Sequence, residues 1–192
     1  MAIDWNHELF DQLDWHWRNH LRPRLDGLTD DEYFWEPVPG WSIRPRGESE
    51  IGVGAGTFAL DYVYPEPDPP PVTTIAWRMG HIIRGVLAER TEHHFGGPKA
   101  EFETFSYAGT AADALIQLDE TYERWSEGVR GLGAEGLLRP CGPAEGPFAE
   151  FPMASLILHI NRETIHHGAE ISLLRDLYRA QMPTGARPRA RP

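Results

Sequence analysis

Apolar side chains recur along this chain at intervals of three and four positions, and polar side chains fill the positions between them. The first such stretch places Phe10, Leu13 and Trp17 on one face. A later stretch repeats the pattern with Leu118 and Tyr122. This spacing matches the turn of an α-helix with one buried face. The pattern predicts long helices over residues 5–25, 73–95, 110–130 and 152–178. Four amphipathic helices predict an all-α fold, a four-helix bundle.

Local capping signals mark the ends of the middle two helices. Thr73 or Thr74 can accept a hydrogen bond from a free N–H at the start of the second helix, and Thr110 can do so for the third. Gly96 and Gly131 follow the last residues of these helices, and glycine at such a position is typical of a helix end. The bounds of both helices are therefore predicted from local residues.

The segment between the first two helices, residues 36–72, is long and rich in proline and glycine. A loop of this length is uncommon in a compact domain unless it shapes a site. Because it carries aromatic residues such as Trp41 and Tyr62, we expect an ordered cover over one end of the bundle, which can include a short hairpin. We expect one domain over residues 1–181 and a disordered basic tail over residues 182–192.

Acidic residues outnumber basic residues, and this balance narrows the class of partner. The chain of 192 residues has a formal net charge of −11, which repels nucleic acids and anionic membrane surfaces. No apolar run approaches the roughly 20 residues of a membrane-spanning helix, and the first residues lack the features of a signal peptide. We therefore expect no nucleic-acid or membrane partner and a cytoplasmic location. Cys141 is the single cysteine, so no disulfide can form within the chain.

The last predicted helix contains the stretch HINRETIHHGAEI, in which acidic and imidazole side chains fall where apolar ones are expected. At roughly 100° per residue, His159, Glu163 and His167 lie in the middle of the apolar stripe of this helix. Asn161 and Arg162 lie away from the stripe, so we expect them to face solvent. Burying a carboxylate and two imidazoles is costly unless each is paired, protonated or bound. These three side chains therefore need a shared partner.

A divalent metal ion is the simplest shared partner. Residues four apart on a helix lie one above the other, so Glu163 and His167 can present an oxygen and a nitrogen to one ion. A third ligand can come from another helix, and His81 lies beside the small residue Gly85 on the second helix. This set suits Zn²⁺ or Ni²⁺ first and Mn²⁺ or Fe²⁺ next, with positions open for water and substrate. A metal-free hydrogen-bonded pair of Glu163 and His167 is the alternative.

At these residues the sequence resembles the DinB/YfiT-like superfamily, in its actinobacterial branch related to mycothiol-dependent enzymes. The motifs are WRMGHI in the second helix, HINRETIHHGAEI in the fourth and LDWHWRNHLRPRLDGLTDDEYFWEPVPGW near the N-terminus. The resemblance implies an antiparallel four-helix bundle, often dimeric, with a divalent metal bound by one histidine of the second helix and two of the fourth. By position, the first ligand falls on His81 and the last on His167. Characterised members include thiol S-transferases that use bacillithiol or mycothiol and a mycothiol-dependent maleylpyruvate isomerase.

The chain departs from the family pattern at the middle ligand. Glu163 stands where the family usually has histidine, and GAE follows the last ligand where RGQ is usual. A carboxylate can ligate, although it shifts the preference toward oxygen-loving metals and weakens the Lewis acid. Alternatively, Glu163 works as a catalytic base beside the site. His159 is then a substitute ligand or a hydrogen-bonding partner of the ligands, and His166 is a hydrogen-bonding partner at the edge of the bundle.

The resemblance implies a metal-dependent thiol S-transferase, with a mycothiol-type thiol as cosubstrate and a small molecule as substrate. Trp41, Trp77, Arg78 and Arg84 are the candidates for binding that substrate. An arginine that turns inward can bind a carboxylate through two hydrogen bonds. We also expect a homodimer. Two other interpretations stay open: a non-enzymatic bundle that binds a metal or a small ligand, and a structural dimer whose polar cluster is a relic.

Overall fold

The computed structural model describes residues 2–181, and this part of the chain is mostly helical, as the apolar pattern predicts. Four long helical stretches, which we call the helical body, comprise residues 5–24, 75–95, 111–130 and 153–181. The predicted tail, residues 182–192, lies outside the described residues. Within residues 2–181, none of the helices has the length and apolar character needed to cross a membrane.

The first helical stretch comprises α1 (Trp5–His16), η1 (Trp17–Leu21) and α2 (Arg22–Arg24). Asp4 caps its start, because a carboxylate oxygen accepts hydrogen bonds from the N–H groups of Asn6 at 3.1 Å and His7 at 3.2 Å. At the end of η1 the N–H of Arg22 bonds five residues back to the carbonyl of Trp17. This is the hydrogen-bond pattern of a π-helix, which widens the turn.

The second helical stretch comprises α4 (Ile75–Gly80), η2 (His81–Ala88) and α5 (Glu89–Phe95). Thr74 caps its start, with the hydroxyl oxygen 3.1 Å from the backbone nitrogen of Trp77. Gly96 ends it in the left-handed conformation, with φ of 77°. Both ends agree with the sequence-based prediction. π-Helical turns such as η2 occur often at functional sites, and η2 begins at His81.

The third helical stretch is α6 (Ala111–Arg130), capped by Thr110 as predicted, and the fourth is α8 (Met153–Gln181). The prediction that Asn161 faces solvent is wrong. Asn161 is only 5 % exposed, and its side-chain amide donates a hydrogen bond to the carbonyl oxygen of Leu9 at 2.8 Å. A buried amide is tolerated when it has such a partner, and this hydrogen bond joins α8 to α1.

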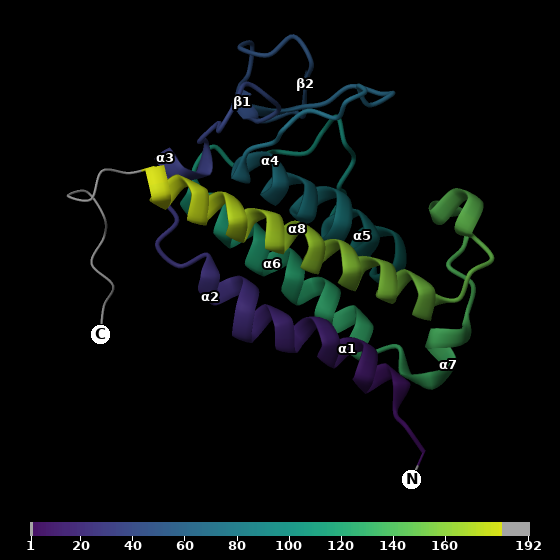
Figure 1. Ribbon diagram of the computed structural model, residues 1–192. Helices are drawn as coiled ribbons and strands as arrows, with labels where there is room; N and C mark the ends of the chain where they lie inside the picture. Colours follow the sequence, from purple (N-terminus) through teal and green to yellow (C-terminus); the bar gives the residue numbers. More distant parts are fainter. Residues whose placement is uncertain (1, 182–192) are drawn as a thin grey trace.

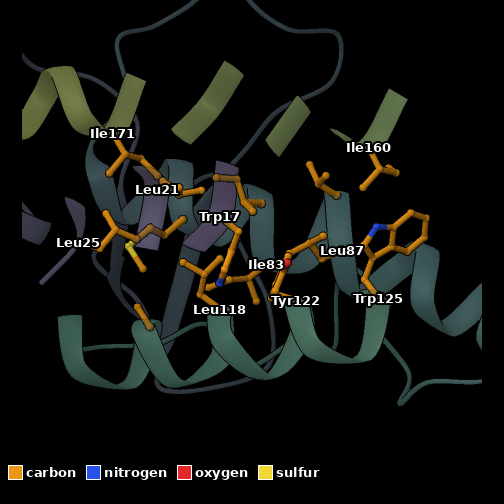
Figure 2. Packing of buried hydrophobic residues seen from close by; sticks show 14 of the residues in the cluster. Trp17, Leu21, Leu25, Ile83, Leu87, Leu118, Tyr122, Trp125, Ile160 and Ile171 are labelled. Carbon is orange, nitrogen blue, oxygen red and sulfur yellow. The ribbon is translucent and has the colours of Figure 1, made fainter. Parts of the chain in front are cut away.

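Each of the four stretches packs against two others. α1 lies beside α8 and α6, while α4 and η2 contact both α8 and α6 (Figure 1). Their inward faces form one apolar core, in which Trp17 stacks on Tyr122 with ring centroids 3.8 Å apart (Figure 2). Leu118, Ile83 and Ile160 bring the third, second and fourth stretches into the same core. Burial of each large apolar side chain contributes about 1.5–3 kcal/mol to the stability of the fold.

A small sheet lies between the first two helical stretches, where the prediction allowed a short hairpin within an all-α fold and the structure has three strands. Its strands are β1 (Ile43–Pro45), β2 (Gly52–Val53) and β3 (Phe58–Asp61). β3 lies between the other two and pairs antiparallel with both, with Leu60 opposite Ile43 and Val53. The sheet lies on α4 (Figure 1), where a Cβ at Gly80 would come within 3.0 Å of Ile43. The fold is thus mostly helical with a small antiparallel sheet.

Trp41 joins the segment that carries the sheet to the start of α4. Its backbone N–H donates to the carbonyl oxygen of Val72 at 2.9 Å, and its carbonyl oxygen accepts from the N–H of Thr74 at 3.0 Å. Gly40 permits this close approach, because a Cβ at that position would collide with the Val72 carbonyl. The cover expected over residues 36–72 therefore lies against the second helical stretch.

Three short elements accompany the long helices: α3 (Asp30–Tyr33), α7 (Gly133–Leu138) and η3 (Pro143–Phe148). A buried ion pair holds α3 to α8, since Arg175 donates to the two carboxylate oxygens of Glu32 at 2.7 and 3.0 Å. η3 forms the green turn drawn above α7 in Figure 1, at the end of the molecule where α8 begins. It therefore stands near the N-terminal half of the helix that carries Glu163.

Candidate metal centre

The three predicted metal ligands come from two helices that pack against each other. His81 is the first residue of η2, and Glu163 and His167 lie one turn apart on α8. Side chains at positions i and i+4 project from the same face of a helix. Ligand atoms of these two residues and of His81 all lie within 4.8 Å of one another. The structure thus brings the three predicted residues together.

His167 contacts both other members of the group. Its Nε2 lies 3.5 Å from Oε2 of Glu163. Its ring meets the ring of His81 edge-on, with centroids 4.8 Å apart and an interplanar angle of 89°. Ligands bound at roughly 2.0–2.2 Å from one ion are themselves about 3–4 Å apart. Small side-chain movements would therefore bring these three donor atoms to coordination distance.

Stacking and burial fix the side chain of His81. Its ring stacks on Trp77 with centroids 5.4 Å apart, and Nε1 of Trp77 donates to the carbonyl oxygen of Asp61 at 2.8 Å. Gly85 leaves room beside the ring, since a Cβ there would lie 3.4 Å from Nδ1 of His81. Burial, and to a lesser extent charge on His167 and nearby arginines, lowers the pKa of His81 to about 3. The ring is therefore neutral, as a metal-ligating imidazole must be.

Glu170, which had no role assigned from the sequence, contacts the last candidate ligand. Its Oε2 lies 2.7 Å from Nδ1 of His167. An ionised carboxylate only accepts hydrogen bonds, so Nδ1 donates and Nε2 keeps its lone pair for a metal. Nε of Arg78 lies 3.0 Å from the same Oε2. The signal in the sequence was the three-residue spacing from His167 to Glu170, which places both side chains on one face of a helix.

A second group of ligand-type atoms, from His166, His167 and Glu170, adjoins the first. Nε2 of His166 is 3.5 Å from Oε1 of Glu170, and the side chain of His166 is 62 % exposed. The guanidinium of Arg78 contacts Glu170 and also lies 3.5 Å from Nδ1 of His167. Its positive charge disfavours a second cation at this position. His166 thus lies at the exposed edge of the site, beside Glu170 and edge-on to the ring of His167 at a centroid distance of 4.9 Å.

His159 lies one helical turn before Glu163 on α8, on the side opposite His167. Its Nδ1 is 3.6 Å from Oε1 of Glu163 and 2.6 Å from Nη2 of Arg162. Nε of Arg162 in turn lies 3.4 Å from the same Oε1. The carboxylate of Glu163 therefore turns one oxygen toward His167 and the other toward two basic side chains. His159 belongs to the second of these environments.

A cavity of about 580 Å³, which we call the metal chamber, opens beside His81 and Glu163. Its volume is that of a pocket for a small molecule. Trp41 and Trp77, both predicted to contact substrate, line it on the side of the sheet. Further residues of the wall include Tyr62, Arg84, Arg90, Phe102, Tyr107 and His159. Two of the candidate ligands, His81 and Glu163, are thus accessible to a molecule bound under the cover.

The two arginines predicted to bind substrate lie in different places. Arg84 lines the metal chamber, while its Nε donates to the carbonyl oxygen of Ala100 at 2.8 Å and its Nη2 pairs with Glu89 at 3.2 Å. Arg78 pairs with Glu170 on the far side of His167. Because both guanidinium groups already have acceptors, a substrate carboxylate would have to compete for them.

The donor set fits a divalent metal ion. Two imidazoles and one carboxylate converge, His81 is neutral, and a carboxylate orients His167 through its other ring nitrogen. The fold and this donor set define a mostly helical protein with a candidate divalent-metal centre.

The family model of the DinB superfamily matches residues 12–171, and the chain belongs to this superfamily. The comparisons with curated proteins and with solved structures gave no significant match. The predicted family is confirmed, and its mycothiol-related branch stays a prediction.

Proposed function

We propose that residues 1–181 form one antiparallel four-helix bundle domain that acts as a metal-dependent thiol S-transferase, and that the protein is a homodimer. The observation that carries the catalytic proposal is the convergence of His81, Glu163 and His167 within 4.8 Å of one another beside a cavity of about 580 Å³. Membership of the DinB superfamily supports it. The packing of each helical stretch against two others supports the bundle.

The three side chains would hold one divalent ion. The imidazoles favour Zn²⁺ or Ni²⁺, whereas the carboxylate also suits Mn²⁺ or Fe²⁺. Such an ion supplies positive charge that favours a thiolate over a thiol. The protein orients both nitrogen donors in advance, because Trp77 stacks on His81 and Glu170 bonds to His167. Oriented ligands bind a metal more tightly than mobile ones.

Glu163 is proposed as the catalytic base as well as a ligand, because its two oxygens have different neighbours. Oε2 faces His167 at 3.5 Å and Oε1 faces His159 at 3.6 Å. The proton from the S–H bond of a mycothiol-type thiol passes to Oε1 and then to His159, whose side chain is 43 % exposed and can release it to water. The sulfur attacks a carbon of a small electrophile, and the leaving group departs with the bonding electrons. Trp41 and Trp77 shield this step from solvent.

A non-enzymatic bundle that binds a metal or a small ligand is the second candidate function. The contacts of Glu163 with Arg162 at 3.4 Å and with His159 at 3.6 Å favour it. Because Oε1 of Glu163 already faces these two basic groups, a thiol would have to compete with them for this oxygen. Both candidates predict a bound ligand at this site, and only the transferase predicts turnover.

Metal content tests the site first. Tag-free protein is exposed anaerobically to equimolar Zn²⁺, Ni²⁺, Mn²⁺ and Fe²⁺, and bound metal is measured by elemental mass spectrometry. We expect about one ion per chain, with binding lost in Glu163→Ala and His167→Ala. His166→Ala is the matched control on the same helix, because His166 is exposed and is not one of the three proposed ligands, while its ring packs edge-on against that of His167. It should retain the ion.

Steady-state assays then separate the two candidate functions. The metal-loaded protein is mixed with mycothiol and a small aryl halide, and thioether formation is followed. Turnover that falls in Glu163→Gln, which keeps the shape of the side chain and removes the base, supports the transferase. Metal binding without turnover assigns the non-enzymatic function. A wild-type protein that holds no metal contradicts the metal-dependent transferase.

A further inference from the structure

A second cavity, of about 640 Å³, lies between η3 and α8. Arg90 and His159 line this cavity and also the metal chamber, so the two cavities adjoin at these side chains. We call the second cavity the outer chamber. Its apolar wall is formed by Cys141, Pro147, Phe148, Phe151 and Leu156. Its lining residues come from η3, from the residues next to it and from the first turns of α8; Figure 1 shows where these two elements lie. The outer chamber thus adjoins the metal chamber at Arg90 and His159 and is of similar size.

The wall of the outer chamber exposes large aromatic side chains. Phe148 and Phe151 are 59 % and 51 % exposed, and their rings meet edge-on with centroids 5.6 Å apart. Leu156 of α8 is buried on the same wall. Exposed apolar patches of this kind mark sites for ligands or partners. Because this patch is hollow and adjoins the metal chamber, a ligand of that chamber is the occupant that fits.

The outer chamber is fixed to the helical body by hydrogen bonds. The N–H of Cys141 donates to the carbonyl oxygen of Phe151 at 2.8 Å, which closes the loop that carries η3. Glu145 of η3 lies 2.9 Å from Nε2 of His94 on α5, and both side chains are buried. These contacts hold η3 against α5 and keep the apolar wall facing α8.

The wall of the metal chamber includes a tyrosine whose buried hydroxyl lacks a partner among the described residues. Tyr107 lines the chamber and is only 4 % exposed, and its hydroxyl has no hydrogen-bond partner among residues 2–181. A buried hydroxyl without a partner is unfavourable. Burial raises the pKa of Tyr107, so the hydroxyl keeps its proton and can donate. Because the hydroxyl is itself buried, a ligand that carries an acceptor atom would satisfy it after a small movement of the ring.

We propose that the substrate is an amphipathic small molecule whose polar head lies in the metal chamber and whose apolar arm lies in the outer chamber. The head carries a carbonyl or a similar acceptor for the hydroxyl of Tyr107. The arm is an aryl or alkyl group that packs on Phe148 and Phe151. This inference rests on the proposed function, because it gives the substrate class of the same site. A small, fully polar electrophile would leave the apolar wall in water and is disfavoured.

Two amides test this inference on the full-length protein. N-(4-phenylbutyl)acetamide has an acceptor head and an apolar arm, and N-methylacetamide has the same head with the arm removed. Dissociation constants are measured by ligand-observed NMR with metal-free and with zinc-loaded protein. We expect the long amide to bind at least about tenfold more tightly, because its arm leaves water for the apolar wall.

Two variants test which residues contact the arm and the head of the amides. Phe151→Ser should weaken binding of the long amide about fivefold and leave the short amide unchanged, because only the apolar wall is altered. Tyr107→Phe should weaken both amides, since both heads use the hydroxyl. Leu138→Ser is the matched control, at an apolar residue that is 77 % exposed and lies away from both chambers. It should change neither dissociation constant. Circular dichroism confirms that each variant is folded.

The outcomes separate this inference from the proposed function. Equal affinity for the two amides, or an equal loss in Phe151→Ser and Leu138→Ser, overturns the two-chamber substrate. If His167→Ala loses zinc and still prefers the long amide, the preference belongs to the chambers themselves, as we infer. If the wild-type protein holds zinc and shows no preference, the metal site stands and the outer chamber has no part in recognition.

Discussion

At the scale of single residues, Glu170 should set how tightly the metal is bound. Its hydrogen bond to Nδ1 of His167 orients the ring and leaves Nε2 for the ion. Loss of a partner of this kind typically weakens metal affinity about 10–100-fold. We expect this loss in Glu170→Ala, measured by zinc competition with a chromophoric chelator. His166→Ala, one position from His167, should bind zinc as the wild type does. Equal affinity in Glu170→Ala and wild type would show that His167 is oriented by other contacts.

The identity of residue 163 should decide which metal is preferred. Glu163 provides an oxygen where the family usually has a histidine nitrogen, and its Oε2 faces Nε2 of His167. Nitrogen donors favour Zn²⁺ and Ni²⁺ over Mn²⁺. We therefore expect Glu163→His to raise the ratio of bound zinc to bound manganese in the mixed-metal experiment. The same ratio in both proteins would mean that residue 163 does not ligate.

At the scale of elements, the sheet should depend on Arg44. Its Nε donates to Asp61 at 2.9 Å and its Nη1 to Glu36 at 2.8 Å, which ties β1 to β3 and to the preceding loop. Asp61 is buried, so Arg44→Ala would leave its carboxylate without a counter-charge. We expect a loss of about 1–3 kcal/mol in the free energy of unfolding in urea. Lys99→Ala removes an exposed ion pair and should cost less than about 1 kcal/mol. Similar losses in both variants would contradict this role.

The helix ends were predictable from the sequence, whereas a short hairpin was the most that the sequence indicated for the three-stranded sheet. Thr74, Gly96 and Thr110 act on residues within one turn, so local sequence contains the whole interaction. The strands depend on pairs such as Ile43 with Leu60, which lie far apart in a segment whose prolines and glycines are typical of a loop. Short strands in such a segment leave a weak periodic signal.

At the scale of the whole molecule, the candidate site too combines residues that local sequence predicts with contacts between distant segments that it does not predict. Glu163 and His167 were predictable because they lie one helical turn apart, and His81 because its motif resembles that of a family. The outer chamber depends on how η3 folds back onto α5 and α8, and no local pattern contains that contact. The partner of Asn161 was missed for the same reason, since it is a carbonyl oxygen on α1.

A metal ion should stabilise the whole molecule, because its proposed ligands join two helical stretches. His81 belongs to the second stretch and His167 to the fourth, so the ion binds only when these helices are packed. At free zinc 100 times the dissociation constant, binding adds about 2.7 kcal/mol, which for a chain of this length raises Tm by roughly 5–11 °C. Differential scanning calorimetry should show this increase in wild type and in His166→Ala. His81→Ala should lose it, whatever its own Tm. If zinc raises the Tm of His81→Ala equally, the ion is bound elsewhere and the proposed site is wrong.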